Sequence, residues 1–304
     1  MHPRGAPVLV FDVGGSHIAA SVFDPQSGSI GAIRELPLLP GAEPEIFFGT
    51  FDSLVSTALP APAVPRGFAI AIPSPFDYEL GISRMRHKFQ SLYGMDLRQE
   101  FSRRFGCAQV DIHFLNDASA SLIGELHGGA ATGAQRAISI TLGTGVGSAF
   151  AVGVNIVANG AGVPPGGEIW NQPYRDGTVE DCVSTLAIQR TFEQLTGKRL
   201  QVCEIASSTS HREEAQEAFE KFGRELGSVL REISAGFAPD HIVLGGGIAR
   251  AADRFLAATK AELGDFRNRL FVSELFERAP LIGAGISWLK RNAAVGTLMK
   301  REEL

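Results

Sequence analysis

Two stretches of the chain decide the fold: VLVFDVGGSHIAASVF at residues 8–23 and ISITLGTGVGSAFAV at residues 138–152. In each, an apolar run of strand length leads into a glycine-containing turn with a serine or threonine, and a second apolar run follows. One hairpin of this kind is common. Because each of these two opens a stretch in which strands and helices alternate, the pattern predicts a duplicated domain.

The segments around the two hairpins indicate an α/β fold. Apolar runs and turn residues predict further strands at 29–36, 67–72, 110–115 and 241–244, and helices at about 46–58, 96–105, 118–127, 179–195, 211–237 and from 283 onward. Strands that alternate with helices form sheets covered by helices. Ligands of such folds bind at the loops that follow strands, which is where the glycine-rich turns of this chain lie.

Composition narrows the class of protein. The 304 residues include 35 glycines, more than the usual ~7%, but no Gly-X-Y repeat, so the glycines serve local purposes. The three cysteines include no C-x-x-C pair, which argues against a disulfide framework and a cysteine zinc site. A net charge of −5 disfavours general nucleic-acid binding. The uncharged stretch 137–167 is broken by glycines and prolines, so we expect buried strands rather than a membrane span.

Three glycine-rich turns are candidate nucleotide sites, two of them for phosphate and the third, at 245–247, for close approach of the nucleotide to the backbone. Glycine lacks a Cβ, so its backbone N–H groups approach phosphate oxygens closely. Residues 12–16 read DVGGS and add a carboxylate, Asp12, that suits Mg²⁺ held directly or through water. Residues 142–147 read LGTGVG and add the hydroxyl of Thr144, and residues 245–247 read GGG between a predicted strand and a helix. Each turn is also compatible with an ordinary hairpin or packing turn.

Asn116 and Asp117 form the most informative polar pair, because they stand where a predicted apolar strand ends and a helix begins. A carboxylate at this position commonly caps the helix. Alternatively, Asp117 is a general base that accepts the proton of a substrate hydroxyl during phosphoryl transfer, and Asn116 holds that substrate in register. The pair alone leaves both interpretations open.

A third polar cluster, Glu168, Asn171 and Glu180, suits a sugar. Carboxylates accept hydrogen bonds from sugar hydroxyls, and an amide both donates and accepts. The same residue types are common in solvated loops, so the significance of this cluster depends on its combination with the other motifs.

The chain resembles the ROK family of bacterial sugar kinases in six motifs, which follow in order: DVGGS from Asp12, ND from Asn116, LGTGVG from Leu142, GGEI from Gly166, ExxxS from Glu180 and LGGGI from Leu244. The resemblance spans most of the chain. It implies the actin-like, hexokinase-like ATPase fold (ribonuclease H-like), with two duplicated α/β domains and an interdomain cleft. We therefore expect a smaller first domain over 1–115, joined by the C-terminal helix of about 288–304, and a larger second domain over 116–287.

The resemblance also implies a role for each matching residue. Asp117 would be the catalytic base, Asn116 a ligand of one sugar hydroxyl, and Glu168, Asn171 and Glu180 ligands of further hydroxyls. ATP would be lined by the glycine turns: Gly14, Gly15, Ser16, Gly143, Thr144, Gly145, Gly245, Gly246 and Gly247. Asp12 would support Mg²⁺ bound with ATP. The reaction implied is ATP-dependent phosphorylation of a hexose of the glucose type, as in the glucokinases of the family.

Two departures from the family pattern concern the sugar loop. The family motif GEIGH reads GEIWN here, so Asn171 stands where a histidine binds sugar and, in many members, zinc. The family's C-x-C-G-x-x-G-C cluster is also missing, and Thr178 occupies the place of its last cysteine. We therefore expect a variant without a zinc site, in which packing of Trp170 and Tyr174 holds the loop.

Other functions compete with the kinase. Asn171 favours a sugar-sensing regulator of the same family that no longer catalyses. Such repressors carry a DNA-binding helix-turn-helix ahead of the ROK part, however, and only seven residues precede the first strand here. Asp117 would also serve no purpose in a regulator. A kinase that uses polyphosphate, and an ATPase of the same fold with a non-sugar acceptor, are further alternatives.

The expected partner is a small-molecule sugar, with no nucleic acid and no membrane. We expect a cytoplasmic protein, because residues 1–7 lack the apolar segment of a signal peptide. Members of the family are often dimers, so the resemblance makes a homodimer one expected assembly. The segment 81–90 either contributes His87 or Lys88 to the substrate site or is a solvated basic loop.

Overall fold

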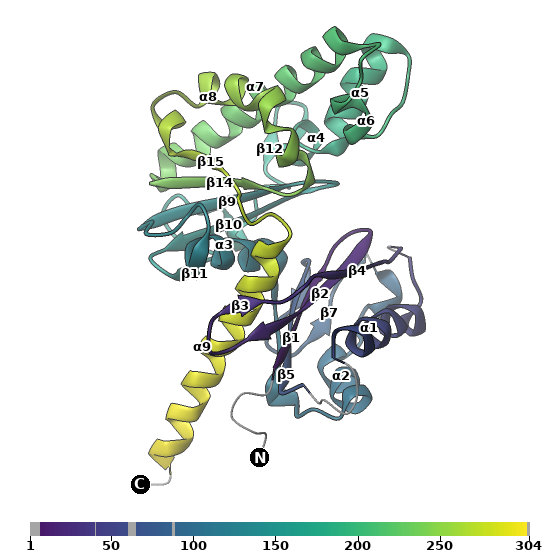
Figure 1. Ribbon diagram of the computed structural model, residues 1–304. Coiled ribbons are helices and arrows are strands. Elements are labelled where there is room, and N and C mark those ends of the chain that lie inside the picture. Colours follow the sequence, from purple (N-terminus) through teal and green to yellow (C-terminus); the bar gives the residue numbers. More distant parts are fainter. Residues whose placement is uncertain (1–6, 40, 60–64, 87–88, 303–304) are drawn as a thin grey trace. The chain divides into compact units, whose positions relative to one another are not determined.

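The chain forms two compact units (Figure 1), which are Met1–Gly124 together with Glu277–Leu304, and Glu125–Phe276. The computed structural model describes residues 7–39, 41–59, 65–86 and 89–302. His87 and Lys88, expected as substrate contacts or parts of a solvated loop, lie outside these residues. No helix in the described ranges combines the length and apolar character that a membrane span requires.

A six-stranded sheet forms the centre of the first unit, in the order β3-β2-β1-β5-β8 with β4 also paired to β2. Strand β2 runs antiparallel to β1, whereas β1, β5 and β8 run parallel to one another. The bounds are β1 Val8–Val13, β2 His17–Asp24, β3 Ser29–Ile30, β4 Arg34–Pro37, β5 Gly67–Ile72 and β8 Ile112–Asn116. All of β5 and nearly all of β1 are buried, as expected of parallel strands with helices on both faces.

The strand predicted over 29–36 is instead two short strands, β3 and β4, because one extra residue interrupts the ladder with β2. Phe23 of β2 lies opposite Ile30, and Ala20 lies opposite Arg34. Residues 21–22 of β2 therefore face residues 31–33 of the neighbouring segment. This arrangement is a β-bulge, which composition alone does not reveal.

Helices α1 (Pro44–Ala58) and α2 (Leu97–Phe105) pack on the sheet through phenylalanine side chains. The ring of Phe51 lies 4.8 Å from the ring of Phe101 in an edge-on arrangement and 4.8 Å from the ring of Phe11. Such aromatic pairs bury large areas and add about 0.5–1.5 kcal/mol beyond the area term. Short elements of this unit are β6 Phe76–Asp77, β7 Ile82–Ser83 and 3₁₀ turns at Gln90–Leu92 and Gln109–Asp111.

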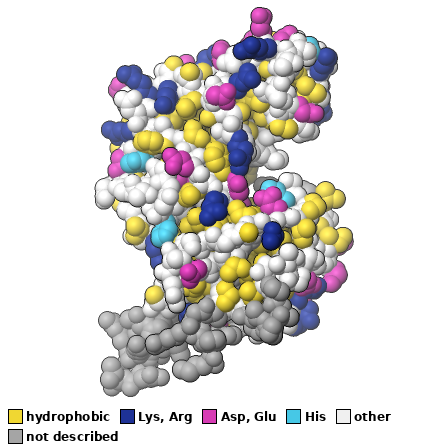
Figure 2. Space-filling model, viewed as in Figure 1, with side chains coloured by type: hydrophobic (Ala, Val, Ile, Leu, Met, Phe, Trp, Pro, Cys, Tyr) yellow, Lys and Arg dark blue, Asp and Glu magenta, His cyan; other side chains and the backbone are white. Residues whose placement is uncertain are grey.

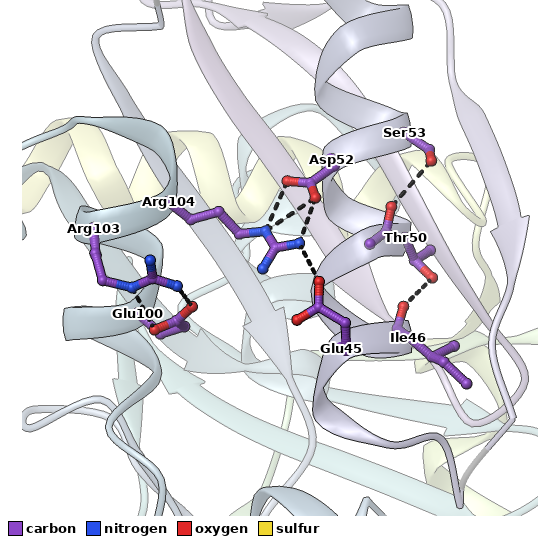
Figure 3. A network of polar contacts seen from close by, with 9 residues as sticks. Glu45, Ile46, Thr50, Asp52, Ser53, Glu100, Arg103 and Arg104 are labelled. Atoms are coloured by element: carbon purple, nitrogen blue, oxygen red, sulfur yellow. Dashed lines mark hydrogen bonds and ion pairs between the residues drawn. The ribbon is translucent and has the colours of Figure 1, made fainter.

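An ion-pair network joins α1 to α2 outside the aromatic core (Figure 3). The Arg104 guanidinium binds Asp52 through Nε at 2.9 Å and Nη2 at 2.6 Å, and Nη2 also reaches Glu45 at 3.0 Å. The Arg104 side chain is only 17% exposed, so this pair is better shielded than the neighbouring Arg103–Glu100 pair. The hydrogen bonds to Asp52, and then the one to Glu45, raise the pKa of Arg104 above the ordinary value of an arginine.

The last helix, α9 (Arg278–Glu302), belongs to the first unit and packs against β1, β2 and β5. The indole of Trp288 is fully buried and donates from Nε1 to the Asp111 carbonyl at 2.9 Å. Helix α9 also lies against α3 (Asp117–Gly128) at a very close approach, because a Cβ on Gly283 would meet the Ala120 carbonyl oxygen at 1.8 Å. Only glycine permits this approach.

The second unit repeats the opening pattern of the first. Its five-stranded sheet has the order β11-β10-β9-β14-β15, with β10 antiparallel to β9 and β14 parallel to it. The strands are β9 Arg136–Leu142, β10 Val146–Val152, β11 Asn155–Val157, β14 His241–Gly245 and β15 Leu270–Val272. In both units an antiparallel hairpin is followed by a strand parallel to its first member, which agrees with the duplication predicted from the sequence.

Helices α7 (Arg212–Phe237) and α8 (Ala252–Leu263) form the largest helix pair of the second unit. They approach closely at Gly223 and Gly227, where an added Cβ would meet the carbonyl oxygens of Phe255 and Thr259 at 2.5 Å. The remaining elements of this unit are α4 Val179–Cys182, α5 Thr185–Thr196, α6 Val202–Ala206, β12 Pro173–Tyr174, β13 Gly177–Thr178 and 3₁₀ turns at Pro165–Gly167, Gly247–Ala251 and Gly264–Arg269.

Surface charges of both signs are mixed on each unit. On the face drawn in Figure 2, Lys and Arg side chains are interspersed with Asp and Glu side chains. Several form exposed pairs, such as Arg224 with Glu220 within α7, and Arg231 of α7 with Glu262 of α8. Exposed pairs of this kind contribute about 0–1 kcal/mol each, so the fold depends on its cores rather than on these charges.

The two helical glycines Gly283 and Gly49 predict opposite effects of the same substitution. Gly283→Ala forces a Cβ into the Ala120 backbone and should lower the free energy of unfolding by about 1–3 kcal/mol. Gly49→Ala, in α1, meets no atom within 4 Å and should raise it by up to about 1 kcal/mol through helix propensity. Urea unfolding of both variants measures the difference. Equal shifts would contradict the close packing of α9 on α3.

Candidate active site

The carboxyl ends of β1, β5 and β8 meet at one edge of the first unit's sheet. Asp12 of β1 is in register with Ala71 of β5, and Ile72 of β5 is in register with Asn116 of β8. Parallel pairing therefore brings Asp12 to the same edge as Asn116 and Asp117, although about a hundred residues separate them in sequence. This is the edge at which open α/β sheets bind ligands.

Asn116 and Asp117 both accept backbone amides at the start of α3. The Asn116 side-chain oxygen accepts the Ser119 amide at 3.0 Å, and Asp117 Oδ1 accepts the Ala118 amide at 2.8 Å. These are otherwise unpaired first-turn amides, and the positive end of the helix dipole favours a carboxylate there. The Asn116 amide nitrogen also donates to the Tyr78 hydroxyl at 3.4 Å, and that hydroxyl donates to the Ile72 carbonyl at 3.1 Å. Both side chains are thereby oriented by their surroundings.

Asp12 lies in a strongly anionic environment. Burial, together with the negative charges of Asp117 and Glu35, raises the pKa of Asp12 to about 7. Glu35 is brought near by strand register, because Asp12 pairs with Ala19 on β2 and Ala19 pairs with Glu35 on β4. A partly buried carboxylate among other carboxylates, with no cationic partner among the described side chains, suits a bound cation.

The turn between β1 and β2 carries Gly14, Gly15 and Ser16. The Gly14 amide donates to the His17 carbonyl at 2.9 Å, and the Ser16 carbonyl accepts the Leu38 amide at 2.9 Å. Gly15 and Ser16 are exposed, and a Cβ on Gly15 would meet no atom within 4 Å. The space above Gly15 is therefore open for a ligand oxygen to approach the backbone.

The turn between β9 and β10, Gly143 to Gly145, is held by two side chains of the second unit, Glu180 and Thr185. Glu180 Oε2 accepts the Val146 amide at 2.9 Å, and a Cβ on Gly145 would meet that same oxygen at 2.4 Å. On the other side, the Gly143 carbonyl accepts both the amide and the hydroxyl of Thr185 at 2.9 Å. Thr144 is exposed at the tip.

The glycines 245–247 lie beside this turn, because β14 runs parallel to β9 and Gly245 is in register with Thr141. Gly246 has a left-handed φ of 80°, and an added Cβ would meet the Leu142 carbonyl oxygen at 2.4 Å. A side chain there would be both strained and blocked. Gly247 begins a 3₁₀ turn and has no atom within 4 Å of an added Cβ. Two of the three predicted glycine sites are thus neighbours in the second unit.

The loop that carries Glu168 is shaped by two successive glycines in left-handed conformations, Gly166 with φ 72° and Gly167 with φ 71°. Ser148 of β10 anchors the loop, because its hydroxyl donates to the Gly167 carbonyl at 2.7 Å and accepts the Ile169 amide at 3.1 Å. Glu168 is partly exposed, and its Oε2 accepts the Trp170 indole N–H at 2.9 Å.

Asn171 and Glu180 are linked to the same loop. Asn171 is exposed and lies next to Trp170, whose carbonyl accepts the Glu180 amide at 3.1 Å. Glu168 and Asn171 therefore lie on one loop, and Glu180 of α4 is tied to that loop through Trp170. Glu180 also contacts the Gly143–Gly145 turn. The structure places the predicted sugar residues of the second unit close to one of its predicted phosphate turns.

Polar contacts fix the segment that stands in place of the family's cysteine cluster. The Tyr174 hydroxyl and Arg175 Nε both donate to Glu225 Oε2 of α7 at 2.7 Å. Thr178 caps α4 with Asp181 in a reciprocal capping box. Tyr174 was expected from the sequence to hold this loop, but the role of Glu225 was not. Within the described ranges, no group of three or more His, Cys, Asp or Glu residues is arranged to hold a metal.

Several residues of the site escaped the sequence analysis: Glu35, Tyr78, Ser148, Trp170 as a partner of Glu168, and Thr185. Only Trp170 carried a local signal, since it departs from the family motif. The others come from strands, a turn and a helix start, and their proximity to the site is a tertiary property.

The fold is the actin-like ATPase fold. A ROK family glucokinase from Streptomyces griseus, solved with glucose and AMPPNP, superposes with a TM-score of 0.74 at 20% identity, over 92% of this chain and 98% of that one. A ROK family transcriptional regulator, a homologue of the E. coli MLC protein, superposes with a TM-score of 0.75 at 16% identity, over 94% of this chain and 79% of that one. Likeness at these identities establishes the fold.

The family follows from the sequence match. The model of the ROK family matches residues 8–289, and the chain belongs to that family. Among characterised relatives, a glucokinase of Thermotoga maritima is 26% identical over 246 residues, which cover 71% of this chain and 76% of that protein. The resemblance noted in the six motifs is thereby confirmed at the level of the family.

The raised pKa of Asp12 predicts a pH dependence of stability. Between about pH 4 and pH 7 the folded chain keeps a proton that the unfolded chain, with an ordinary value of 3.8, has lost. The contribution of Asp12 to the free energy of unfolding is therefore complete at low pH and is lost as the pH rises through about 7. Asp12→Asn removes this titration, so wild type should lose stability relative to the variant over this range.

Urea unfolding at intervals of pH measures this difference. Asp117→Asn provides the matched control, because removing one neighbouring charge should lower the pKa of Asp12 and weaken the pH dependence without abolishing it. Parallel stability curves for wild type and Asp12→Asn would show that Asp12 titrates normally.

The contact of Gly145 with Glu180 predicts a local effect of Gly145→Ala. The added Cβ must displace Glu180 Oε2 from the Val146 amide. A hydrogen bond to a charged group contributes about 1.5–3 kcal/mol. Its loss should therefore make hydrogen exchange at Val146 roughly 10- to 150-fold faster. Gly143→Ala, which meets no atom within 4 Å, should leave that exchange rate nearly unchanged. Similar rates in both variants would argue against the contact.

Proposed function

We propose that this ROK-family chain is a sugar kinase that transfers the γ-phosphoryl group of ATP to a hydroxyl of a glucose-type hexose, with Asp117 as general base. The observation that carries the proposal is the grouping of Asp12, Asn116 and Asp117 at the carboxyl edge of three parallel strands. The glycine turns and the Glu168 loop add a phosphate-binding and a hydroxyl-binding element to the same chain.

Asp117 has the position that a general base requires. One of its oxygens is tied to the Ala118 amide, which orients the carboxylate at the start of α3. In the reaction, the sugar hydroxyl gives its proton to Asp117 while its oxygen bonds to the γ-phosphorus, and the bond from that phosphorus to the leaving ADP oxygen breaks. Asn116, held by Ser119 and Tyr78, keeps the acceptor sugar in register with the carboxylate.

The glycine turns are suited to the nucleotide. Gly14, Gly15 and Ser16 form one turn, and Gly143, Thr144 and Gly145 form the other, with backbone amides and hydroxyls available for phosphate oxygens. Gly245, Gly246 and Gly247 leave a backbone surface without side chains, which suits the adenosine portion. Glu180 and Thr185 hold the second turn in shape through the contacts to Val146 and Gly143.

Asp12 is the residue suited to Mg²⁺ bound with ATP. The fit rests on its raised pKa, which results from burial and from the charges of Asp117 and Glu35, because a divalent cation relieves this clustering of negative charge. When bound, Mg²⁺ supplies neutralising charge to the phosphate oxygens. Asp12 holds it directly or through water.

The Glu168 loop is suited to the hexose. Glu168 and Asn171 present a carboxylate and an amide at the surface of the loop, both able to bond to neighbouring hydroxyls. Glu180 adds a second carboxylate, whose Oε2 is already occupied by the Val146 amide. A sugar hydroxyl on Glu180 would therefore bond to a residue that also supports the phosphate turn, which favours ordered binding of the two substrates.

A sugar-sensing regulator is the second candidate. The substitution of Asn171 for the family histidine and the likeness to a ROK regulator favour it. The two candidates differ in turnover. A panel of sugars is assayed with ATP, by release of ADP, and with polyphosphate, by formation of sugar phosphate. The result favours the regulator only if no sugar is phosphorylated with either donor.

Asp117→Asn is the direct test of the base. The variant should lose about 10²- to 10⁴-fold in kcat, because the amide cannot accept the hydroxyl proton, while sugar binding by calorimetry stays close to wild type. Asp253→Asn, at a side chain 79% exposed on α8, controls for the loss of one negative charge and should keep full turnover. Near-wild-type turnover of Asp117→Asn would show that another group is the base.

A further inference from the structure

Trp170 is unusual in its setting. It is a large aromatic side chain that remains 36% exposed, and it lies between Glu168 and Asn171, the two surface residues proposed to bind sugar hydroxyls. The other tryptophan of the chain, Trp288, is completely buried. A partly exposed indole beside residues proposed to bind a ligand offers a binding surface, because tryptophan combines a large apolar ring with a polar N–H.

Hydrogen bonds hold the Trp170 indole in one orientation. Its Nε1 donates to Glu168 Oε2 at 2.9 Å, and the Trp170 carbonyl accepts the Glu180 amide at 3.1 Å. The preceding residue, Ile169, is buried and its amide bonds to Ser148. The ring is thus held at its nitrogen and along its backbone, while part of its surface stays in contact with solvent.

Polar and aromatic groups recognise different parts of a sugar. Carboxylates and amides bind the hydroxyl edge of a pyranose, whereas an aromatic ring contacts its apolar C–H face through dispersion and burial. A hydroxyl bonded to Glu168 lies about 2.7 Å from the carboxylate. The carboxylate in turn lies 2.9 Å from the indole nitrogen, so a sugar bonded to Glu168 binds next to the indole.

We propose that Trp170 is a stacking surface for the sugar, so that the substrate class is a closed pyranose ring with an apolar C–H face. This inference rests on the proposed sugar site and deepens it. It assigns to Trp170 the affinity that Asn171 alone would not supply in place of the family histidine. It also excludes open-chain polyols and acceptors without such a face as good substrates.

Intrinsic fluorescence tests the contact without requiring turnover. Because Trp288 is buried, a change in emission or in acrylamide quenching on adding sugar reports on Trp170. Glucose and methyl β-glucoside should alter the emission and protect the indole from quenching, whereas sorbitol, which has the hydroxyls but no ring face, should do neither. The change should disappear in Trp170→Phe, which retains only the Trp288 signal.

Kinetics supply a second readout. Trp170→Ala should raise the KM for glucose about 3- to 12-fold with kcat within about twofold, because stacking contributes equally to the ground and transition states. Trp170→Phe should recover most of this loss. Phe271→Ala removes an aromatic ring of similar exposure, 38%, from β15 and should leave KM unchanged.

The outcomes separate this inference from the proposed function. Turnover of glucose with no fluorescence change, or with an unchanged KM in Trp170→Ala, overturns the stacking role and leaves the kinase intact. A fluorescence response to pyranoses without turnover supports the stacking role and overturns the kinase. An equal response to sorbitol overturns the proposed preference for a closed ring.

Discussion

Parallel strand pairing is the constraint on which the arrangement of the site depends. In the first unit, β1, β5 and β8 end at one edge, and their register carries Asp12 and the Asn116–Asp117 pair to that edge. In the second unit, β9 and β14 do the same for two glycine turns. Because parallel neighbours end together, residues from distant parts of the sequence gather at one edge.

Close approaches of the backbone add a second level of organisation. Gly246 lies against the Leu142 backbone, where no side chain fits, and Gly145 lies against Glu180, where a side chain would displace the carboxylate. Glu180 joins two parts of that unit, since its side chain supports the Val146 amide and its amide bonds to the Trp170 carbonyl. A carboxylate expected only to bind sugar therefore also supports the turn proposed to bind phosphate.

The departures from the family motif are compensated by contacts within the second unit. The segment that replaces the cysteine cluster is tied to α7 by Tyr174 and Arg175, which share one oxygen of Glu225. Trp170, in place of the motif's glycine, bonds to Glu168. The loop is thus held by hydrogen bonds and ion pairs within the described chain, and its exposed residues remain available to a ligand.

The sequence by itself determined the duplicated strand–glycine turn–strand pattern, the order of the main elements and the identity of the candidate residues, because periodicity and turn chemistry are local. It missed the three-residue strand β15 and the bulge that divides β3 from β4, since both depend on pairing with distant strands. Only the tertiary structure decided that burial and the charges of Asp117 and Glu35 raise the pKa of Asp12, and that Glu180 supports Val146. Such effects act through space, and no spacing along the chain encodes them.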